Sequence, residues 1–301
     1  MSPLLKAIAL TLTAITQAHM QLHSPASLNA SNNPHTTGPP DNRLHYPHNC
    51  CGRKTEYPCR GYLNLLGTPA GAPTVTWAPG SRQSWSMAGP APLGGTHYGG
   101  SCQIGLSLDK GKTFRTITSY EGNCPHRNGS EDSAGQMFNF TVPNDLPVGE
   151  AVFAWTWFNR EQEFNMNCAA VLISGGNSTS KVGGGYSAMM ETSLDRVNAT
   201  AALTRTIIVT ETEGECGSSA AQLICSTPST YSPTTSPPTS MPSSVAFNDR
   251  PKMLIVDIAN GCLPPKTIAE LKFPEPGVDV EEGDGMYPLS LPVGDCSVAL
   301  W

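Results

Sequence analysis

Two histidines lie in sequence surroundings that could form a metal site. His97 lies in the glycine-rich run 94–103, GGTHYGGSCQ. Glycines on both sides let the backbone turn sharply, which would leave the imidazole exposed on a loop. His19 directly follows Ala18, and the stretch 16–18 ends in the small-x-small pattern of a signal-peptidase site. Cleavage after Ala18 would make His19 the first residue of the mature protein.

A histidine at the amino terminus has a specific metal chemistry. Its α-amino nitrogen and its Nδ1 can chelate one metal ion together, and the imidazole of His97 would complete a three-nitrogen site. Tetragonal nitrogen ligation favours Cu(II), once the amino group has lost its proton. From these residues alone, simpler interpretations stay open: His19 could be the exposed start of a frayed terminus, and His97 an ordinary surface side chain.

The beginning of the chain indicates export. Lys6 precedes the apolar stretch 7–15, which is too short to span a bilayer, and no later segment reaches about 18 uninterrupted apolar residues. All ten cysteines follow the expected cleavage point, which suits an oxidising compartment. Five glycosylation sequons agree with this; they start at Asn29, Asn128, Asn139, Asn177 and Asn198. We therefore expect a secreted, extracellular protein with disulfides and no membrane span.

The composition favours a loop-rich β protein. Only 14% of the residues are charged, and the chain holds 29 glycines and 27 prolines. A charged fraction near 25% is usual for globular proteins. The formal net charge is −6, so nothing here builds a cationic surface for nucleic-acid phosphates.

Short apolar runs alternate with turn-forming clusters as far as about residue 173. Such spacing predicts an antiparallel β-sandwich or barrel. We expect a signal peptide at 1–18, a folded core at 19–174, a Gly/Ser/Thr/Pro-rich, largely flexible insert at 175–247, and a C-terminal extended segment at 248–301 that packs back on the core. Within that last segment, 252–258 is a candidate buried strand. The expected core strands are 75–77, 102–108, 113–119, 137–142, 151–158 and 166–173.

Several motifs together resemble a known family. The chain is similar to the fungal lytic polysaccharide monooxygenases of auxiliary activity family eleven, with its motifs in the family's order and at compatible spacing. The similarity covers about 19–173 and 248–280. Its motifs are the His19-Met20 start, YPCRGY (57–62), HYGGSCQ (97–103), SYEGNCP (119–125), AWTWFN (154–159), MNCA (166–169), RPKM (250–253), NGC (260–262) and FPEPG (273–277).

The resemblance implies a copper enzyme on an immunoglobulin-like antiparallel β-sandwich that cleaves chitin oxidatively. It assigns the amino nitrogen and Nδ1 of His19, together with His97, to one copper ion per chain. The copper would use an external electron donor, which could be a small molecule or a protein, and O2 or H2O2 as co-substrate. The oxidant would remove a hydrogen from a glycosidic carbon, after which the hydroxylated linkage breaks by elimination. The polymer surface is insoluble and cannot enter a deep pocket, so the metal must be exposed.

The resemblance also assigns roles around the metal, with one departure. Glu163 would be the carboxylate that shapes the oxygen site, and Asn165 stands at the axial position where the family usually has tyrosine. An amide lacks the oxidisable ring of a phenol, whereas Phe164 should face the core. Tyr98 is a candidate for stacking on a sugar ring. By motif position, we expect disulfides Cys102–Cys124 and Cys59–Cys168.

A second cluster of metal-binding residue types lies at 45–51. A zinc site at His45, His48, Cys50 and Cys51 would need thiolates that an exported protein tends to oxidise. The pairing of Cys50, Cys51, Cys262 and Cys296 stays open, and Cys216–Cys225 is expected as a local pair.

The sequence favours a monomeric monooxygenase acting on chitin or a related β-1,4-glycan, with no nucleic acid or membrane as partner. The alternatives are a non-catalytic copper- and polysaccharide-binding protein of the same fold and a cell-wall interaction protein.

Overall fold

The chain folds around two packed β-sheets. The computed structural model describes residues 19–89, 95–175, 245–265 and 268–296. These ranges contain β-strands and short 3-10 helices but no α-helix, and no helix in them is long and apolar enough to span a membrane. The 3-10 helices are η1 (Cys50–Gly52), η2 (Cys59–Leu65), η3 (Pro69–Gly71) and η4 (Phe247–Asp249).

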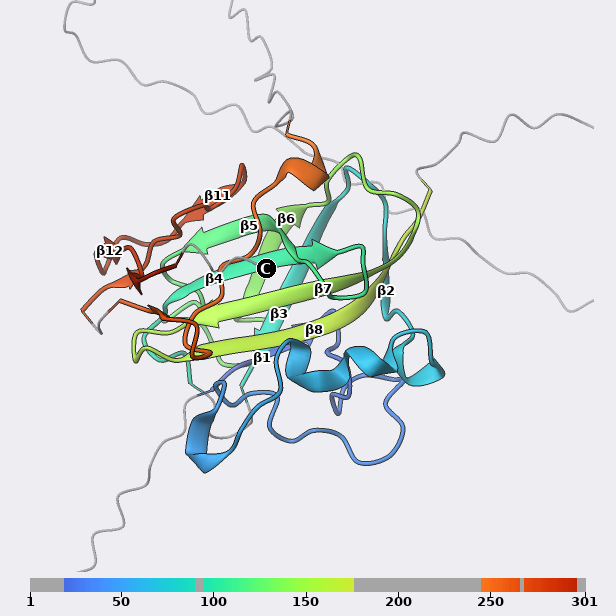
Figure 1. Cartoon of the computed structure of the whole chain (residues 1–301), viewed down its shortest axis with the longest axis horizontal. Helices are drawn as coiled ribbons and strands as arrows, with labels where there is room; N and C mark the ends of the chain where they lie inside the picture. Colours follow the sequence, from blue (N-terminus) through green and yellow to red (C-terminus); the bar gives the residue numbers. More distant parts are fainter. Residues whose placement is uncertain (1–18, 90–94, 176–244, 266–267, 297–301) are drawn as a thin grey trace, which may run out of the picture. The chain divides into compact units, whose positions relative to one another are not determined.

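The sheets differ in size and edge structure. The smaller is antiparallel, in the order β1 (Gln21–Ser24), β3 (Arg82–Ala88) and β6 (Met137–Thr141). The larger has antiparallel central strands and a parallel partner at each edge, as Figure 1 shows for most of its members. Its order is β11 (Val280–Glu282), β5 (Arg115–Glu121), β4 (Ser101–Ser107), β7 (Gly149–Phe158), β8 (Phe164–Ile173) and β2 (Val75–Trp77). The remaining short strands are β9 (Cys262–Leu263), β10 (Glu270–Leu271), β12 (Leu289–Ser290) and β13 (Val293–Gly294).

An aromatic core joins the sheets. Trp85 of β3 stacks on Phe138 of β6, with ring centroids 4.7 Å apart, and lies 6.4 Å from Trp155 of β7. Strand β6 alternates exposed and buried residues, as expected where one face meets solvent. Trp155 and Trp157 are both fully buried, so they serve the core and cannot form an exposed sugar platform.

The C-terminal segment covers the other face of the larger sheet. Strands β7 and β8 are buried along almost their whole length, without alternation, because apolar layers lie on both sides. The outer layer contains the buried stretch 253–256 and Phe273, whose ring lies 5.6 Å from that of Phe158. Strand β11 of the same C-terminal segment pairs with β5 and so forms one edge of the larger sheet. Residues far apart in sequence therefore share one compact unit.

The predicted β-sandwich is confirmed, and the details differ in three places. Sequence reasoning missed β1 and β3, which carry serines and other polar residues between their apolar ones. The expected strand 252–258 does not form: Lys252 makes an isolated bridge with Arg115, and the next N–H groups bond elsewhere. Met253 donates to the Phe114 carbonyl, and Leu254 to the side chain of Gln103. Strand β2 matches the predicted strand 75–77, whereas β11 and the parallel pairing of both edge strands were not expected.

Four disulfides connect the described residues. The structure joins Cys102 to Cys124 and Cys59 to Cys168, the two pairs that the resemblance implies. The cysteines whose pairing was open form Cys50–Cys51 and Cys262–Cys296. This leaves no thiolates for the zinc site considered at Cys50 and Cys51. The expected signal peptide, most of the expected insert and the expected Cys216–Cys225 pair lie outside the described residues.

The half-buried histidine His48 is expected to make fold stability depend on pH. His48 lies against Phe164, whose carbonyl accepts its backbone N–H at 2.6 Å. Burial, assisted by the Arg60 charge, lowers the pKa of His48 from 6.5 to about 4. The unfolded chain therefore binds a proton at a higher pH than the folded chain. This contribution to stability is complete above pH 6.5 and is lost as the pH falls toward 4.

We expect the His48→Gln variant to lose less stability between pH 7 and pH 4.5 than the wild type, since glutamine has no proton to take up. Urea denaturation at several pH values, followed by tryptophan fluorescence, measures this difference. An identical pH dependence in the two proteins would contradict the assignment to His48.

Candidate metal centre

The fold brings His19 and His97 together. His19 lies just before β1, and His97 lies in the loop that connects β3 to β4. Because Gln21 pairs with Ala88, the last residue of β3, the start of β1 and this loop share one end of the small sheet. The two imidazole rings lie 5.3 Å apart at an angle of 72°. Both residues are more than 90% buried, at 4% and 8% exposure. The expectation of an exposed His97 imidazole was therefore wrong, because Glu161 and Trp157 pack against the ring.

The turn between β7 and β8 adds two carboxylates. Glu161 places Oε2 at 3.0 Å from Nδ1 of His97, and Glu163 places Oε2 at 3.9 Å from its Nε2. Asn159 holds this turn: its Oδ1 accepts the backbone N–H groups of Glu161 and Glu163, both at 2.9 Å. Its Nδ2 donates to the Glu163 carboxylate at 2.6 Å. The turn thereby fixes both carboxylates against His97.

The two carboxylates have different environments. Glu161 is half exposed and occupies Nδ1 of His97, so Nε2 is the nitrogen left toward Glu163. A metal-binding histidine commonly uses its second nitrogen in this way, which fixes the ring. Burial raises the pKa of Glu163, while the Asn159 hydrogen bond and the His97 charge act against that rise.

Glu163 also reaches His19. A ring nitrogen of His19, a Glu163 oxygen and the Cys50 sulfur lie within 4.8 Å of one another. Cys50 cannot act as a thiolate there because it is bonded to Cys51. The donors that remain around Glu163 are imidazole nitrogens and carboxylate oxygens.

Asn165 occupies a buried position beside this group. It pairs with Trp157 across β7 and β8, and the Trp157 ring lies 5.6 Å from that of His97. Phe164 points to the opposite face and packs on Phe158, as expected. Neither Oδ1 nor Nδ2 of Asn165 has a hydrogen-bond partner among the described residues, although the side chain is fully buried. An unpaired buried polar group costs about 1–3 kcal/mol, so this amide fits a site that holds a further ligand.

The donor set fits a transition metal such as copper. Imidazole nitrogens suit copper and zinc, whereas magnesium and calcium prefer shells made of oxygen alone. If the chain is cleaved after Ala18, the amino group of His19 adds a third nitrogen to the two imidazoles. The resulting set is the one that Cu(II) favours over other divalent ions.

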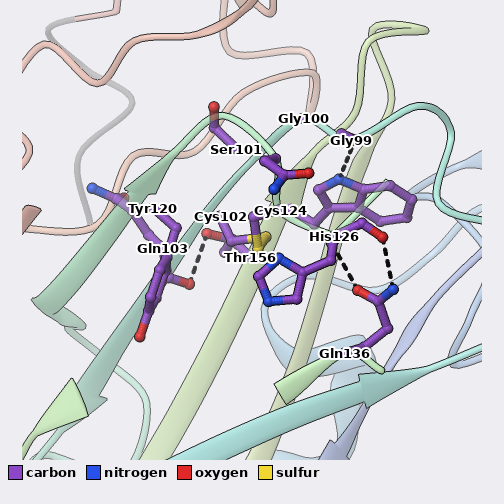
Figure 2. The surroundings of a disulfide bond; sticks show 12 residues. Gly99, Gly100, Ser101, Cys102, Gln103, Tyr120, Cys124, His126, Gln136 and Thr156 are labelled. Carbon is purple, nitrogen blue, oxygen red and sulfur yellow. Dashed lines mark hydrogen bonds between the residues drawn. A yellow bond between two sulfur atoms is a disulfide. The ribbon is translucent and has the colours of Figure 1, made fainter. Parts of the chain in front are cut away.

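The loop that carries His97 is anchored to the larger sheet. Figure 2 shows Gly99 and Gly100 beside the Cys102–Cys124 disulfide. The indole N–H of Trp157 donates to the Gly99 carbonyl at 3.2 Å, and the Cys124 N–H to the Gly100 carbonyl at 3.1 Å. Tyr98 projects outward and is 68% exposed. The Cys59–Cys168 disulfide connects η2 to β8, three residues beyond Asn165.

Sequence reasoning missed three residues of this centre. Glu161 and Asn159 act in the β7–β8 turn, where their side chains bond backbone and imidazole groups at short range. The sequence signal for such a turn is Asn159, because asparagine favours turns, followed by Glu161 and Glu163 with one residue between them. Tyr46 is the third: its ring lies 5.1 Å from that of His19. No motif pointed to it, because only the tertiary fold places it there.

Gly100 is a position where only glycine fits. Its φ is +124°, and a Cβ would lie 2.4 Å from the Phe158 carbonyl oxygen and 2.8 Å from the Trp157 indole nitrogen. Gly149 is a matched control because its φ is +142° and a Cβ there would meet nothing within 4 Å. We expect Gly149→Ala to cost about 1–3 kcal/mol of unfolding free energy from backbone strain. Gly100→Ala should cost a further 1–3 kcal/mol or so from overpacking. Denaturant titration measures both, and equal losses would contradict the close packing of this loop.

Comparisons with known proteins identify relatives of this chain. No family model matches the chain. The AA11 family lytic polysaccharide monooxygenase A of Aspergillus fumigatus is 38% identical over 178 residues, which cover 57% of this chain and 72% of that protein. An AA11 family lytic polysaccharide monooxygenase of Aspergillus oryzae is 34% identical over 136 residues, covering 41% of this chain and 31% of that protein.

Solved structures give weaker likenesses. An AA10 lytic polysaccharide monooxygenase from Streptomyces lividans aligns with a TM-score of 0.29 and 12% identity, over 52% of this chain and 100% of that one. A cellulose-active polysaccharide monooxygenase from M. thermophila aligns with a TM-score of 0.28 and 13% identity, over 36% and 56%. The sequence relationship is therefore the informative one. At 38% identity over 72% of a curated member, the chain belongs to the AA11 family of lytic polysaccharide monooxygenases.

Proposed function

We propose that this protein is a secreted, copper-dependent monooxygenase that oxidatively cleaves chitin or a related β-1,4-glycan. One observation carries the proposal: the histidine that signal-peptide cleavage would expose lies 5.3 Å, ring to ring, from the histidine of the glycine-rich loop. Two separate sequence features thus meet at one point. Family membership supports copper and polysaccharide oxidation, while chitin as substrate rests on the resemblance described above.

His19 and His97 would hold the copper. The amino nitrogen and Nδ1 of His19, with Nε2 of His97, make up the donor set. Bound copper supplies the redox chemistry by which O2 or H2O2 oxidises a C–H bond of the glycan. An external reductant is needed as well, because oxidation of a C–H bond by O2 consumes two further electrons, and the cysteines near the site are already oxidised to disulfides.

The chain's own residues orient the ligands and handle protons. Glu161 holds the His97 ring through Nδ1, so that Nε2 keeps its direction. The raised pKa of Glu163 lets Oε2 hold or release a proton beside Nε2, while Asn159 fixes the carboxylate. Asn165 offers an unpaired amide to a water or co-substrate in the same space. We assign Glu163 and Asn165 to catalysis on these grounds.

Tyr98 is the residue that we assign to the glycan. Its side chain is strongly exposed and directly follows the ligand His97. A phenol ring in such a position can stack on the apolar face of a sugar while its hydroxyl stays in water. An insoluble polymer surface could contact Tyr98 without entering a pocket.

Secretion has independent support from the chain's chemistry. Four disulfides among the described residues suit an oxidising compartment. The sequon residues Asn128 and Asn139 are exposed, where a glycan could be attached. The proposed chelate itself requires removal of residues 1–18, which happens on export.

A second function is favoured by Asn165. The family usually places tyrosine there, and an amide has no ring to oxidise. If that tyrosine is essential, the protein would bind copper and polysaccharide without turnover. Incubation of the copper-loaded mature protein with β-chitin and ascorbate separates the two, since oxidised oligosaccharides detected by mass spectrometry support the enzyme. Chitin binding without such products supports the binding protein.

Correct processing should decide copper affinity. We expect protein that begins at His19 to bind one Cu(II) tightly, and protein with one extra N-terminal residue to bind it more than about 100-fold more weakly. The extra peptide bond removes the amino ligand, which should cost more than losing a group that only orients a ligand. Calorimetry measures both affinities. Equal affinity would rule out the chelate at His19.

The Asn165→Tyr variant tests the axial position. With both histidines and Glu163 in place, we expect it to alter the Cu(II) spectrum and slow inactivation by peroxide, with little change in initial rate. Time courses on β-chitin, with circular dichroism to check the fold, provide the measurement. A wild type that is silent on chitin, cellulose and xylan, yet activated by this substitution, would favour the binding protein instead.

A further inference from the structure

The loop that presents His97 has an unfavourable backbone. Four consecutive residues have positive φ angles: His97 at 44°, Tyr98 at 58°, Gly99 at 100° and Gly100 at 124°. Glycine accepts such angles, but each of the two side-chain-bearing residues gives up about 1–2 kcal/mol. Conformations of this kind persist where the surroundings enforce them. Contacts from outside the loop must therefore hold His97 in place.

A buried carboxylate of the C-terminal segment makes those contacts. Glu270 of β10 has a side chain that is only 1% exposed. Its Oε1 accepts the Gly100 N–H at 2.9 Å and the Asn123 N–H at 3.1 Å. The first bond holds the end of the strained run, and the second holds the turn that leads to Cys124. Glu270 thus bonds both segments that the Cys102–Cys124 disulfide joins.

Arg127 connects this carboxylate to the loop. One guanidinium nitrogen, Nη2, lies 3.1 and 3.3 Å from the two oxygens of Glu270, and Nη1 donates to the Tyr98 carbonyl. Nε and Nη2 also donate to Asp284, each at 2.8 Å, which forms a bidentate pair. Because Asp284 belongs to the C-terminal segment as well, Arg127 is held from the same side as Glu270.

Two glycines let the backbone approach the Glu270–Arg127 pair closely. A Cβ on Gly99 would lie 2.5 Å from Nη1 of Arg127 and 2.6 Å from Oε1 of Glu270. A Cβ on Gly122 would lie 2.7 Å from Oε2 of Glu270. Two glycines on neighbouring loops therefore bring the backbone close to one ion pair.

We propose that Glu270 and Arg127 are positioning residues for the metal ligand His97, an inference that rests on the proposed function. Through them the C-terminal segment becomes part of the copper centre, although neither residue touches the metal. Without the carboxylate, the Gly100 N–H and the guanidinium would lose their common partner. The strained run could then relax and move the His97 ring away from His19.

Copper binding by the mature full-length protein tests this proposal. Glu270→Gln keeps the shape but loses the charge, and Arg127→Lys keeps the charge but loses the planar fork. Glu275→Gln is the matched control, an exposed carboxylate of the same segment. We expect the first two variants to bind Cu(II) about 10–100-fold more weakly by calorimetry, with altered nitrogen hyperfine structure in electron paramagnetic resonance. The control should match the wild type.

Hydrogen exchange of the metal-free proteins provides a second readout. We expect the peptide that contains residues 95–101 to exchange faster in Glu270→Gln than in the wild type, with exchange elsewhere unchanged. If Glu270→Gln fails to fold, Asp284→Asn replaces it, since this partly exposed residue holds Arg127 from the surface.

The outcomes distinguish this inference from the proposed function. A wild type that binds Cu(II) tightly, with variants that match it in affinity, spectrum and exchange, overturns the role of Glu270 and leaves the proposed function intact. A wild type without tight Cu(II) binding overturns the proposed function. In that event faster loop exchange in the variant would still support the positioning of the loop, and unchanged exchange would overturn it.

Discussion

Burial of the central strands β7 and β8 on both faces is the constraint on which the rest of this structure depends. A strand that is apolar on one side needs one covering layer, whereas these strands need two. The small sheet supplies one layer, and the C-terminal segment returns across the chain to supply the other. That return carries β10 and β11 to the end of the sandwich where His97 lies. The apolar packing thus delivers the charged residues of the C-terminal segment to the metal centre.

Several polar and titratable groups are buried at this end of the fold. The fold brings together two buried histidines, the carboxylate Glu163 with its raised pKa, and the unpaired amide of Asn165. Each of these groups lowers folding stability when it is buried without a partner. Together they describe a preorganised site, since a bound cation can offset the desolvation of the carboxylate and use the imidazole nitrogens. The site adjoins the aromatic core between the sheets, since the ring of the core residue Trp157 lies 5.6 Å from that of His97.

Much of the fold could be predicted from the sequence, and the reason is periodicity. The runs at 151–158 and 166–173 are strongly apolar and end at turn-forming residues, so they mark β7 and β8 closely. Strand β3 was missed because its serines and arginine weaken the pattern. The stretch 252–258 was wrongly predicted as a strand because a buried apolar run looks the same whether its backbone groups bond to a strand or to a side chain such as Gln103.

Some residues of the candidate site could likewise be predicted from the sequence, and others could not. His19 and His97 could be found because a cleavage site and a glycine-rich loop leave marks in the sequence. Glu161, Asn159 and Tyr46 leave weak marks, since their value lies in contacts made only after folding. Glu270 is the extreme case: it lies 170 positions from Gly100 in sequence, and its single carboxylate holds a backbone that the loop's own residues disfavour. Ligands can thus be identified from local sequence, whereas the groups that aim those ligands depend on the long-range fold.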